Sequence, residues 1–352
     1  MSELPTRPLN QGTWPLLSGL RFLFATWVLF AHTYNFGLHS RAMPVPSQSG
    51  LVAVVCFFAI SGFSIHHSIK TRPSGYYRRR FWRIFPIHIT AVTLALAGYA
   101  VLGHIFDGHG REYPIPGAFQ WLQYYLLIQV FFYPNYIDVL FPMWSLSIEA
   151  IYYAIAPAII PLTHRTLLIF VAASGVALLL WRFFGEAAIA PYGLQIFTFA
   201  WAWLAGWIAY GRPRNWIAAG LLIIVGWIFI KSQPEQFWLV NKISIMSTYS
   251  SWAVTVILLF FPLQLSLSEL TKRGLNYLGD ISFPLYLIHY PVLFALTSSI
   301  FKTHPEWNYG IVHVIVSFAA ASIVYRFIDK PYRHFGEGSI PTPVVAKLES
   351  QV

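Results

Sequence analysis

Ten long apolar runs, separated by short polar segments, constrain this chain of 352 residues more than any other feature. Each run holds about the 20 residues that a helix needs to cross the hydrocarbon core of a bilayer. Only 10% of the residues are charged, whereas soluble domains carry about 25%, so lipid must surround most of the chain. The sequence predicts an all-α, polytopic membrane helix bundle with about ten transmembrane helices. These lie near residues 15–35, 50–68, 85–104, 144–163, 166–184, 189–210, 216–232, 243–266, 278–300 and 308–328.

An eleventh apolar stretch, near 118–133, is shorter, contains three glutamines and is flanked by prolines. If it does not cross the membrane, 16 Lys and Arg residues face the side of the N-terminus and 6 face the other side; if it crosses, the tally is 11 to 11. The positive-inside rule therefore favours a re-entrant or interfacial segment, with both termini cytoplasmic. Because irregular backbone at membrane depth must line a protein cavity, we expect this segment to border an outward-facing cavity.

The remaining features indicate one membrane domain, residues 1–336, followed by a polar cytoplasmic tail, 337–352. The first run reads as an anchor, and we expect a multi-pass protein of a bacterial inner membrane. The net charge of +10 does not indicate nucleic-acid binding, because the basic residues lie between apolar runs, where they control topology. No set of His, Asp and Glu has metal-ligand spacing on one helix, so no metal is predicted.

Arg21 and His32 lie in the first run, eleven residues apart. Eleven steps of 100° end about 20° past three full turns, so both side chains share one helix face, about 16 Å apart along the axis. Ionisable residues within a membrane span are costly and usually face a protein cavity. Alternatively, both side chains reach to the headgroups at opposite ends of the helix.

Four arginines precede the third run, in a predicted loop: Arg78, Arg79, Arg80 and Arg83. Arg80 and Arg83 are three residues apart and would be neighbours on a helical turn. Paired guanidinium groups suit phosphates, because each can bind two oxygens. An anchor for anionic lipids is the simpler explanation of the same cluster, and the two interpretations are compatible.

Glu149 is the only acidic residue well inside a predicted run, and the predicted topology puts it at the depth of His32. A carboxylate beside an imidazole could orient it as a base; a structural ion pair or a protonated acid is the alternative. His289 lies near mid-membrane, with Asp280 at the inner end of the same run, and could serve function or helix packing. The small residues of Ser61-Gly62-Phe63 favour a close helix contact.

Taken in order, these segments resemble the acyltransferase 3 family of membrane acyltransferases over nearly the whole chain. Asp329 stands where this family commonly has Glu, and Phe283 where it commonly has Tyr. The matching motifs are Arg21-x10-His32, Ser61-Gly62-Phe63, Arg80-Phe-Trp-Arg83, WSLSIEAIYY with Glu149, LGDISFPLYLIHYPV and IDKPYR.

The resemblance implies transfer of an acyl group, usually acetyl, from cytoplasmic acyl-CoA to a hydroxyl of an extracytoplasmic or lipid-linked carbohydrate. The chain resembles the O-antigen and exopolysaccharide O-acetyltransferases of this family, and we expect the form without an SGNH esterase-like domain. The implied catalytic residues are His32, Glu149 and Arg21. Acyl-CoA would be a donor substrate, held by Arg79, Arg80, Arg83 and Ser61, and no cofactor would be bound permanently.

For the chemistry, His32 would take the proton of the attacking hydroxyl, with an acyl-histidine intermediate as the alternative. A polytopic secondary transporter is the competing class, because it would also carry intramembrane charges and broken segments. The sequence has no internal repeat to support it. A lipid-binding scaffold would not need His and Glu at equal depth.

Overall fold

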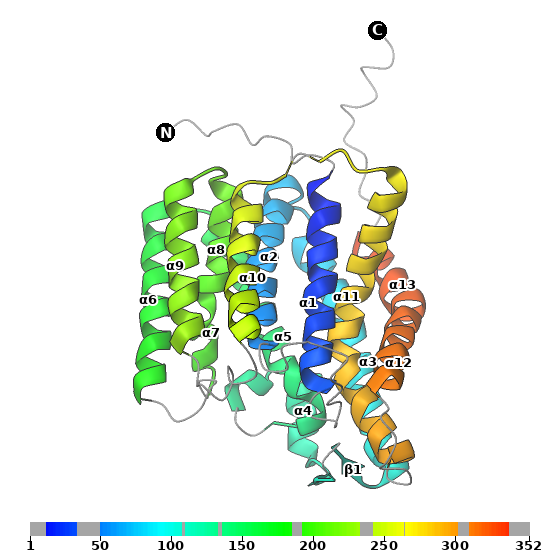
Figure 1. The fold of residues 1–352 in the computed structure, drawn as a ribbon. Coiled ribbons are helices and arrows are strands. Elements are labelled where there is room, and N and C mark those ends of the chain that lie inside the picture. The colour runs from blue at the N-terminus through cyan, green and yellow to red at the C-terminus, as the bar shows by residue number, and fades with distance from the viewer. Residues whose placement is uncertain are drawn as a thin grey trace.

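The computed structural model describes residues 12–33, 50–107, 110–132, 136–184, 192–232, 242–263, 265–301 and 310–337. Long helices dominate these ranges, with one short antiparallel hairpin, β1 (Ile105–Phe106) and β2 (Glu112–Tyr113). Figure 1 shows the helices side by side in a bundle, with the hairpin at one end. The all-α prediction is confirmed. We call the end at which α1 (Thr13–Thr33) begins the arginine end, and the opposite end the hairpin end.

Seven helical segments of the described ranges are long and apolar enough to cross a membrane. The multi-pass prediction is confirmed, while the count of ten stays a prediction. Five of the seven contain α1, α2 (Gly50–Thr71), α3 (Tyr76–Leu102), α6 (His164–Phe184) and α11 (Glu269–Leu296, extended by η5, Thr297–Phe301). The other two contain η3 (Asp138–Met143) with α5 (Trp144–Ile159), and α12 (Gly310–Val324) with η6 (Tyr325–Asp329) and α13 (Lys330–Glu337). The remaining predicted runs correspond to α7 (Leu194–Thr198) with α8 (Ala200–Gly211), α9 (Trp216–Ser232) and α10 (Lys242–Phe260).

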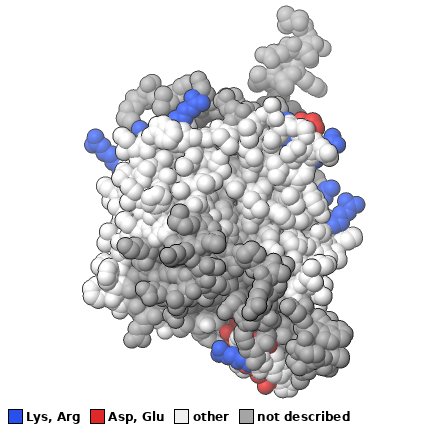
Figure 2. Space-filling model, in the orientation of Figure 1, with Lys and Arg blue, Asp and Glu red and all other residues white. Residues whose placement is uncertain are grey.

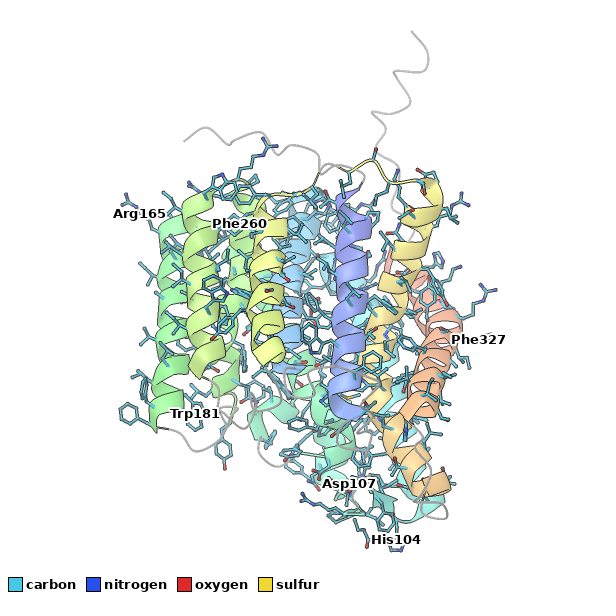
Figure 3. The ribbon with its side chains drawn as sticks, viewed as in Figure 1. His104, Asp107, Arg165, Trp181, Phe260 and Phe327 are labelled. Carbon is cyan, nitrogen blue, oxygen red and sulfur yellow. The ribbon has the colours of Figure 1, made fainter. Side chains whose placement is uncertain are left out.

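The outer surface has the character expected of a bilayer contact. In Figure 2, basic residues gather at the upper rim and the right edge, and a broad band below the rim holds almost no charge. Large apolar side chains point outward, among them Phe183, Ile217 and Phe327 at 82%, 78% and 69% exposure. A soluble monomer rarely exposes so much contiguous apolar surface. Arg165 and Trp181 mark the two ends of α6, which at 21 residues is about 30 Å long (Figure 3).

Glycines allow two helix pairs to approach closely. A Cβ on Gly62 of α2 would lie 1.9 Å from the carbonyl oxygen of Trp203 in α8, and one on Gly206 would lie 1.7 Å from that of Ala59. The interpretation of Ser61-Gly62-Phe63 as a small-residue helix contact is confirmed. Between α1 and α11, a Cβ on Gly279 would meet Cβ of Ser18 at 2.4 Å. These two helices lie side by side and run in the same direction (Figure 1).

The arginine cluster is helical, which corrects the predicted loop. α3 begins at Tyr76, nine residues before the predicted run, and includes Pro86. The chain turns sharply before it at Gly75, whose φ of 66° favours glycine. The guanidinium of Arg79 then donates to the backbone carbonyls of Arg72 and Ser74, which fastens the turn to the helix.

Two other boundaries differ from the prediction. α11 begins at Glu269 because the Ser268 hydroxyl caps it, accepting from the Thr271 amide at 3.2 Å. Asp280 is therefore several turns into the helix, instead of at its end. The segment 118–133 forms the eight-residue α4 (Ala118–Tyr125) and the short η2 (Gln129–Phe132), each too short to cross a membrane. Residues 338–352, nearly all of the predicted tail, lie outside the described residues.

Candidate functional site

A cavity of about 510 Å³ lies between α1, α2, α3, α5 and α11. It extends from the turn between α2 and α3, at the arginine end, to Ser145 and Tyr286 in the interior of the bundle. No described residue of the segment 118–133 lines it. Its charge is strongly positive, because six arginines and only two carboxylates line it. The arginines are Arg21, Arg72, Arg79, Arg80, Arg83 and Arg333, and the carboxylates are Glu149 and Asp280.

Arg80 and Arg83, one turn apart on α3, both face this cavity. Arg80 donates from Nη2 to the Ser68 hydroxyl at 2.7 Å, and its guanidinium lies 5.7 Å from the ring of Tyr153. Its buried Nε has no hydrogen-bond partner among the described residues. The guanidinium of Arg83 donates no hydrogen bond to any residue of the described ranges. Both guanidinium groups therefore keep donors available for an anionic ligand.

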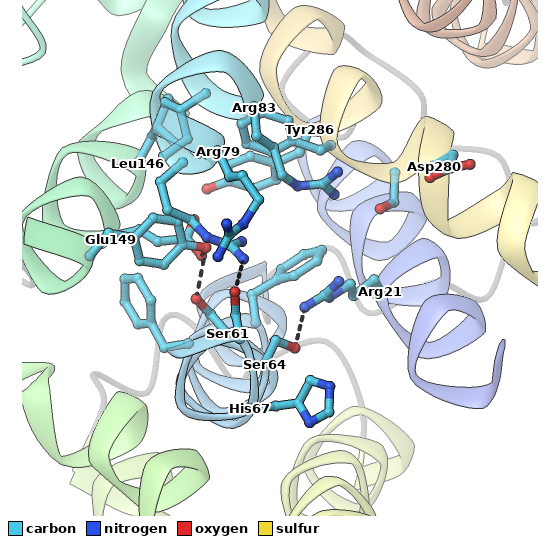
Figure 4. Close-up of a pocket in the computed structure, with 18 of the residues that line it drawn as sticks. Arg21, Ser61, Ser64, His67, Arg79, Arg83, Leu146, Glu149, Asp280 and Tyr286 are labelled. Atoms are coloured by element: carbon cyan, nitrogen blue, oxygen red, sulfur yellow. Dashed lines mark hydrogen bonds between the residues drawn. The ribbon is translucent and has the colours of Figure 1, made fainter. Parts of the chain in front are cut away.

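Arg21 and Arg79 are each held by the protein. Arg21 donates to the Ser64 hydroxyl at 2.6 Å, which points its guanidinium from α1 across the cavity to α2 (Figure 4). Arg79 lines the same cavity but uses both terminal nitrogens on the backbone carbonyls described above. Arg79, which the sequence predicted to help hold acyl-CoA, therefore also has a structural role in the turn.

Glu149 lies on the wall of this cavity and makes no hydrogen bond or ion pair with His32. Its carboxylate accepts from the Tyr153 hydroxyl at 2.6 Å, and the Ser61 hydroxyl donates to Tyr153 at 3.1 Å (Figure 4). The expected pairing of Glu149 with His32 is therefore corrected. The physical reason is that η3 precedes α5, so α5 begins inside the bundle and carries Glu149 deeper than the sequence predicted.

A second charged cluster closes one side of the cavity. Arg333 of α13 forms ion pairs with Asp280 of α11 and with buried Asp329. The Tyr325 hydroxyl donates to Asp280 at 3.0 Å. The cluster fastens the C-terminal helix to α11 and uses two acidic groups to balance one arginine. The IDKPYR segment indicated Asp329 and Arg333 in sequence, but not their partner Asp280.

His32 lies beyond the inner end of the cavity and does not line it. At that end, the hydroxyls of Tyr286 and Ser145 are 2.6 Å apart. The next turn of α11 carries His289, whose ring centroid is 6.2 Å from that of Tyr286. Nε2 of His289 lies 2.8 Å from Nδ1 of His32. The structure thus places a histidine pair directly behind a cationic cavity.

Six predicted residues come together around one cavity, and one does not. Sequence reasoning missed Tyr153, although its spacing of four residues from Glu149 gave a signal. It also left open the partner of His289. The six are Arg21, Ser61, Arg79, Arg80, Arg83 and Glu149; the seventh is His32.

This arrangement can hold a ligand with several anionic groups beside a partly exposed imidazole. Guanidinium groups bind phosphate through parallel hydrogen bonds, which suits a polyphosphate. Within the described ranges, no group of three or more His, Cys, Asp and Glu side chains could hold a metal ion.

Comparisons with known proteins agree on one family. The acyltransferase domain of the acyltransferase 3 type matches residues 15–326. O-acetyltransferase OatA of Staphylococcus aureus is 23% identical over 359 residues, covering 92% of this chain and 57% of its own length. Peptidoglycan O-acetyltransferase OatA of Listeria monocytogenes is 23% identical, covering 92% and 56%. Acyltransferase MdmB of Streptomyces mycarofaciens is 30% identical over 155 residues, covering 41% and 38%. The chain spans little more than half the length of the two OatA relatives, and no solved structure matches it.

Proposed function

Because the chain belongs to the acyltransferase 3 family, we propose that it moves an acetyl group from acetyl-CoA to a hydroxyl of a carbohydrate on the opposite side of the membrane. The names of the two OatA relatives support an O-linked product, and the peptidoglycan in the name of the Listeria relative supports a glycan acceptor. The observation that carries the proposal is the arginine-lined cavity that ends beside His32 and His289. We also propose that the arginine end is cytoplasmic and that the membrane is the bacterial inner membrane.

The donor would bind through its phosphates at the arginine end. Arg80 and Arg83 offer unused donors, and Arg21 lies deeper on the path. Ser61 and Arg79 complete the walls around the ligand. The pantetheine arm would run along α1 from Arg21 towards His32, a distance of about 16 Å for eleven helical residues. This length explains how a phosphate site and a base can act at different depths.

The base would be His32, whose ordinary pKa lies near neutrality and whose charge state can change during a reaction. Its imidazole takes the proton of the sugar hydroxyl as the oxygen attacks the thioester carbonyl. A new C–O bond forms, the C–S bond breaks, and the thiolate of CoA leaves and takes up the proton. An acyl-histidine intermediate, formed if His32 attacks the thioester itself, gives the same products in two steps.

Binding and transfer of labelled acetyl-CoA test this function. The purified protein in membrane vesicles should bind acetyl-CoA labelled in the acetyl group. Mass spectrometry of surface glycans should show O-acetyl groups that depend on the protein. A secondary transporter would move a solute without consuming acetyl-CoA. Absence of both acetyl-CoA binding and glycan acetylation would contradict the proposal.

A further inference from the structure

The contact between His32 and His289 has a geometry that defines its hydrogen bond. The two rings are almost coplanar, at 5°, and their centroids are 5.1 Å apart. This separation is close to the 2.8 Å between Nδ1 and Nε2 plus the distance from each nitrogen to its ring centre. The N–H of one ring therefore points along the lone pair of the other, which is the preferred alignment.

The direction of that bond follows from the backbone. Nδ1 of His289 lies 3.0 Å from the carbonyl oxygen of Leu285, one turn earlier on α11. A carbonyl oxygen only accepts, so Nδ1 of His289 carries a proton. A neutral imidazole has one donor and one acceptor, so Nε2 of His289 accepts from Nδ1–H of His32.

The neutral state of the pair follows from its surroundings. No carboxylate of the described ranges contacts either ring, and the ring of His289 is fully buried. An unpaired charge would be costly there. The resting pair therefore has one tautomer of each ring.

We propose that His289 is a positioning residue that holds His32 as the Nδ1–H tautomer and leaves its Nε2 unprotonated, as the atom that receives the substrate proton. The inference rests on the function proposed for His32. His289 is completely buried, whereas His32 is partly exposed, so the free nitrogen belongs to the accessible ring. When Nε2 takes a proton, the bond from Nδ1–H to His289 becomes charge-assisted and stronger.

Two features of the fold keep the pair in register. α1 and α11 approach closely at Ser18 and Gly279, which fixes their separation. The ring of His32 also packs against Tyr290, with centroids 4.7 Å apart. In the Ser-His-Asp template, an orienting group that fixes the wrong tautomer costs about 10⁴ in kcat. A neutral orienting imidazole should contribute less than that carboxylate.

Two substitutions of His289, each of which replaces the function of only one of its two nitrogens, test the proposal. His289→Gln can place an amide oxygen near the position of Nε2 and still accept from His32. His289→Asn is too short and keeps only a donor near Leu285. We expect His289→Asn to lose roughly 10² in kcat for glycan acetylation, and His289→Gln to recover to within about tenfold of the parent. The KM for acetyl-CoA should stay nearly constant, because His289 does not line the cavity.

Nitrogen-15 NMR of histidine-labelled protein in lipid gives a readout that does not depend on activity. The signals of His32 are identified by their loss in His32→Gln. We expect protonated Nδ1 and unprotonated Nε2 in the parent and in His289→Gln, and a mixture of tautomers in His289→Asn. Protonated Nε2 in the parent, or equal kcat in both variants, would overturn the proposal. If neither the parent nor any variant acetylates glycan, the proposed function of the site is wrong, but the NMR spectrum of the parent still shows which tautomer His32 adopts. The same spectrum tests the proposal if His289→Asn does not fold.

Discussion

The carboxylate of Glu149 accepts a 2.6 Å hydrogen bond from the hydroxyl of Tyr153, one turn later on the same helix. Tyr153 in turn lies under the guanidinium of Arg80 and accepts from Ser61. This chain of contacts joins the one acidic residue of α5 to the cationic wall of the cavity. In the proposed function, Glu149 would therefore organise the acetyl-CoA site, at a distance from the proposed base His32.

Glu149→Ala and Tyr153→Phe should each weaken acetyl-CoA binding severalfold, because each breaks the hydrogen bond that holds the Tyr153 ring beside the guanidinium of Arg80. The kcat at saturating donor should change little. Equilibrium binding and the split between KM and kcat check this. A large loss of kcat with unchanged KM would restore the original expectation that Glu149 orients His32.

Removing the imidazole of His32 should abolish transfer while leaving donor binding intact. A positioned base contributes roughly 10²–10⁴-fold, so His32→Ala should lose at least that much. Acetyl-CoA should still bind, because His32 does not line the cavity. Glycan acetylation and acetyl-CoA binding are measured in membranes matched for protein level. Full glycan acetylation by His32→Ala would contradict the mechanism. Loss of acetyl-CoA binding by the same variant would mean that His32 belongs to the acetyl-CoA site.

Arg80→Ala with Arg83→Ala should weaken acetyl-CoA binding by tenfold or more, because two phosphate donors are removed together. Arg78→Ala is the matched control: it lies on the same helix, is exposed and does not line the cavity. Arg80→Lys should restore binding only in part, since an ammonium lacks the paired donors. Equal affinities for the double variant and the control would leave the cluster as a topology signal alone.

The orientation in the membrane can be tested with single cysteines. A cysteine at Arg165 or Arg212 should resist impermeant thiol reagents added to intact cells, because the positive-inside rule puts both on the cytoplasmic side. A cysteine at Asp107, at the hairpin end, should react (Figure 3). The natural Cys56 is fully buried and should stay silent. Labelling at Arg165 would reverse the assigned orientation.

Gly62→Ala should destabilise the bundle, because the added Cβ would lie 1.9 Å from a backbone oxygen that cannot rotate away. Overpacking of this kind costs about 1–3 kcal/mol. Gly220→Ala on α9 meets nothing within 4 Å and serves as the control. Thermal unfolding in detergent should show a lower midpoint for the first variant alone. Equal midpoints would mean that α2 and α8 separate without cost.

The membrane bundle, the family and six of the residues that line the cavity could be predicted from the sequence alone. Apolar runs report their surroundings directly, since a bilayer selects for length and polarity along one dimension. The spacing of Arg80 and Arg83 likewise makes them neighbours on any helix, although the structure was needed to show that they lie on α3 and not in a loop.

Which helices face each other, and at what depth, became known only from the packing of the fold. The contact between His32 and His289 joins residues 257 positions apart and depends on the rotation of two helices about their axes. Glu149 lies on the cavity wall and not beside His32, because the turns of η3 before α5 place the whole helix deeper in the bundle. Helical periodicity assigns a side chain to a face, but the partner of that face is chosen by packing between helices, where Gly62 and Gly279 permit the closest approach.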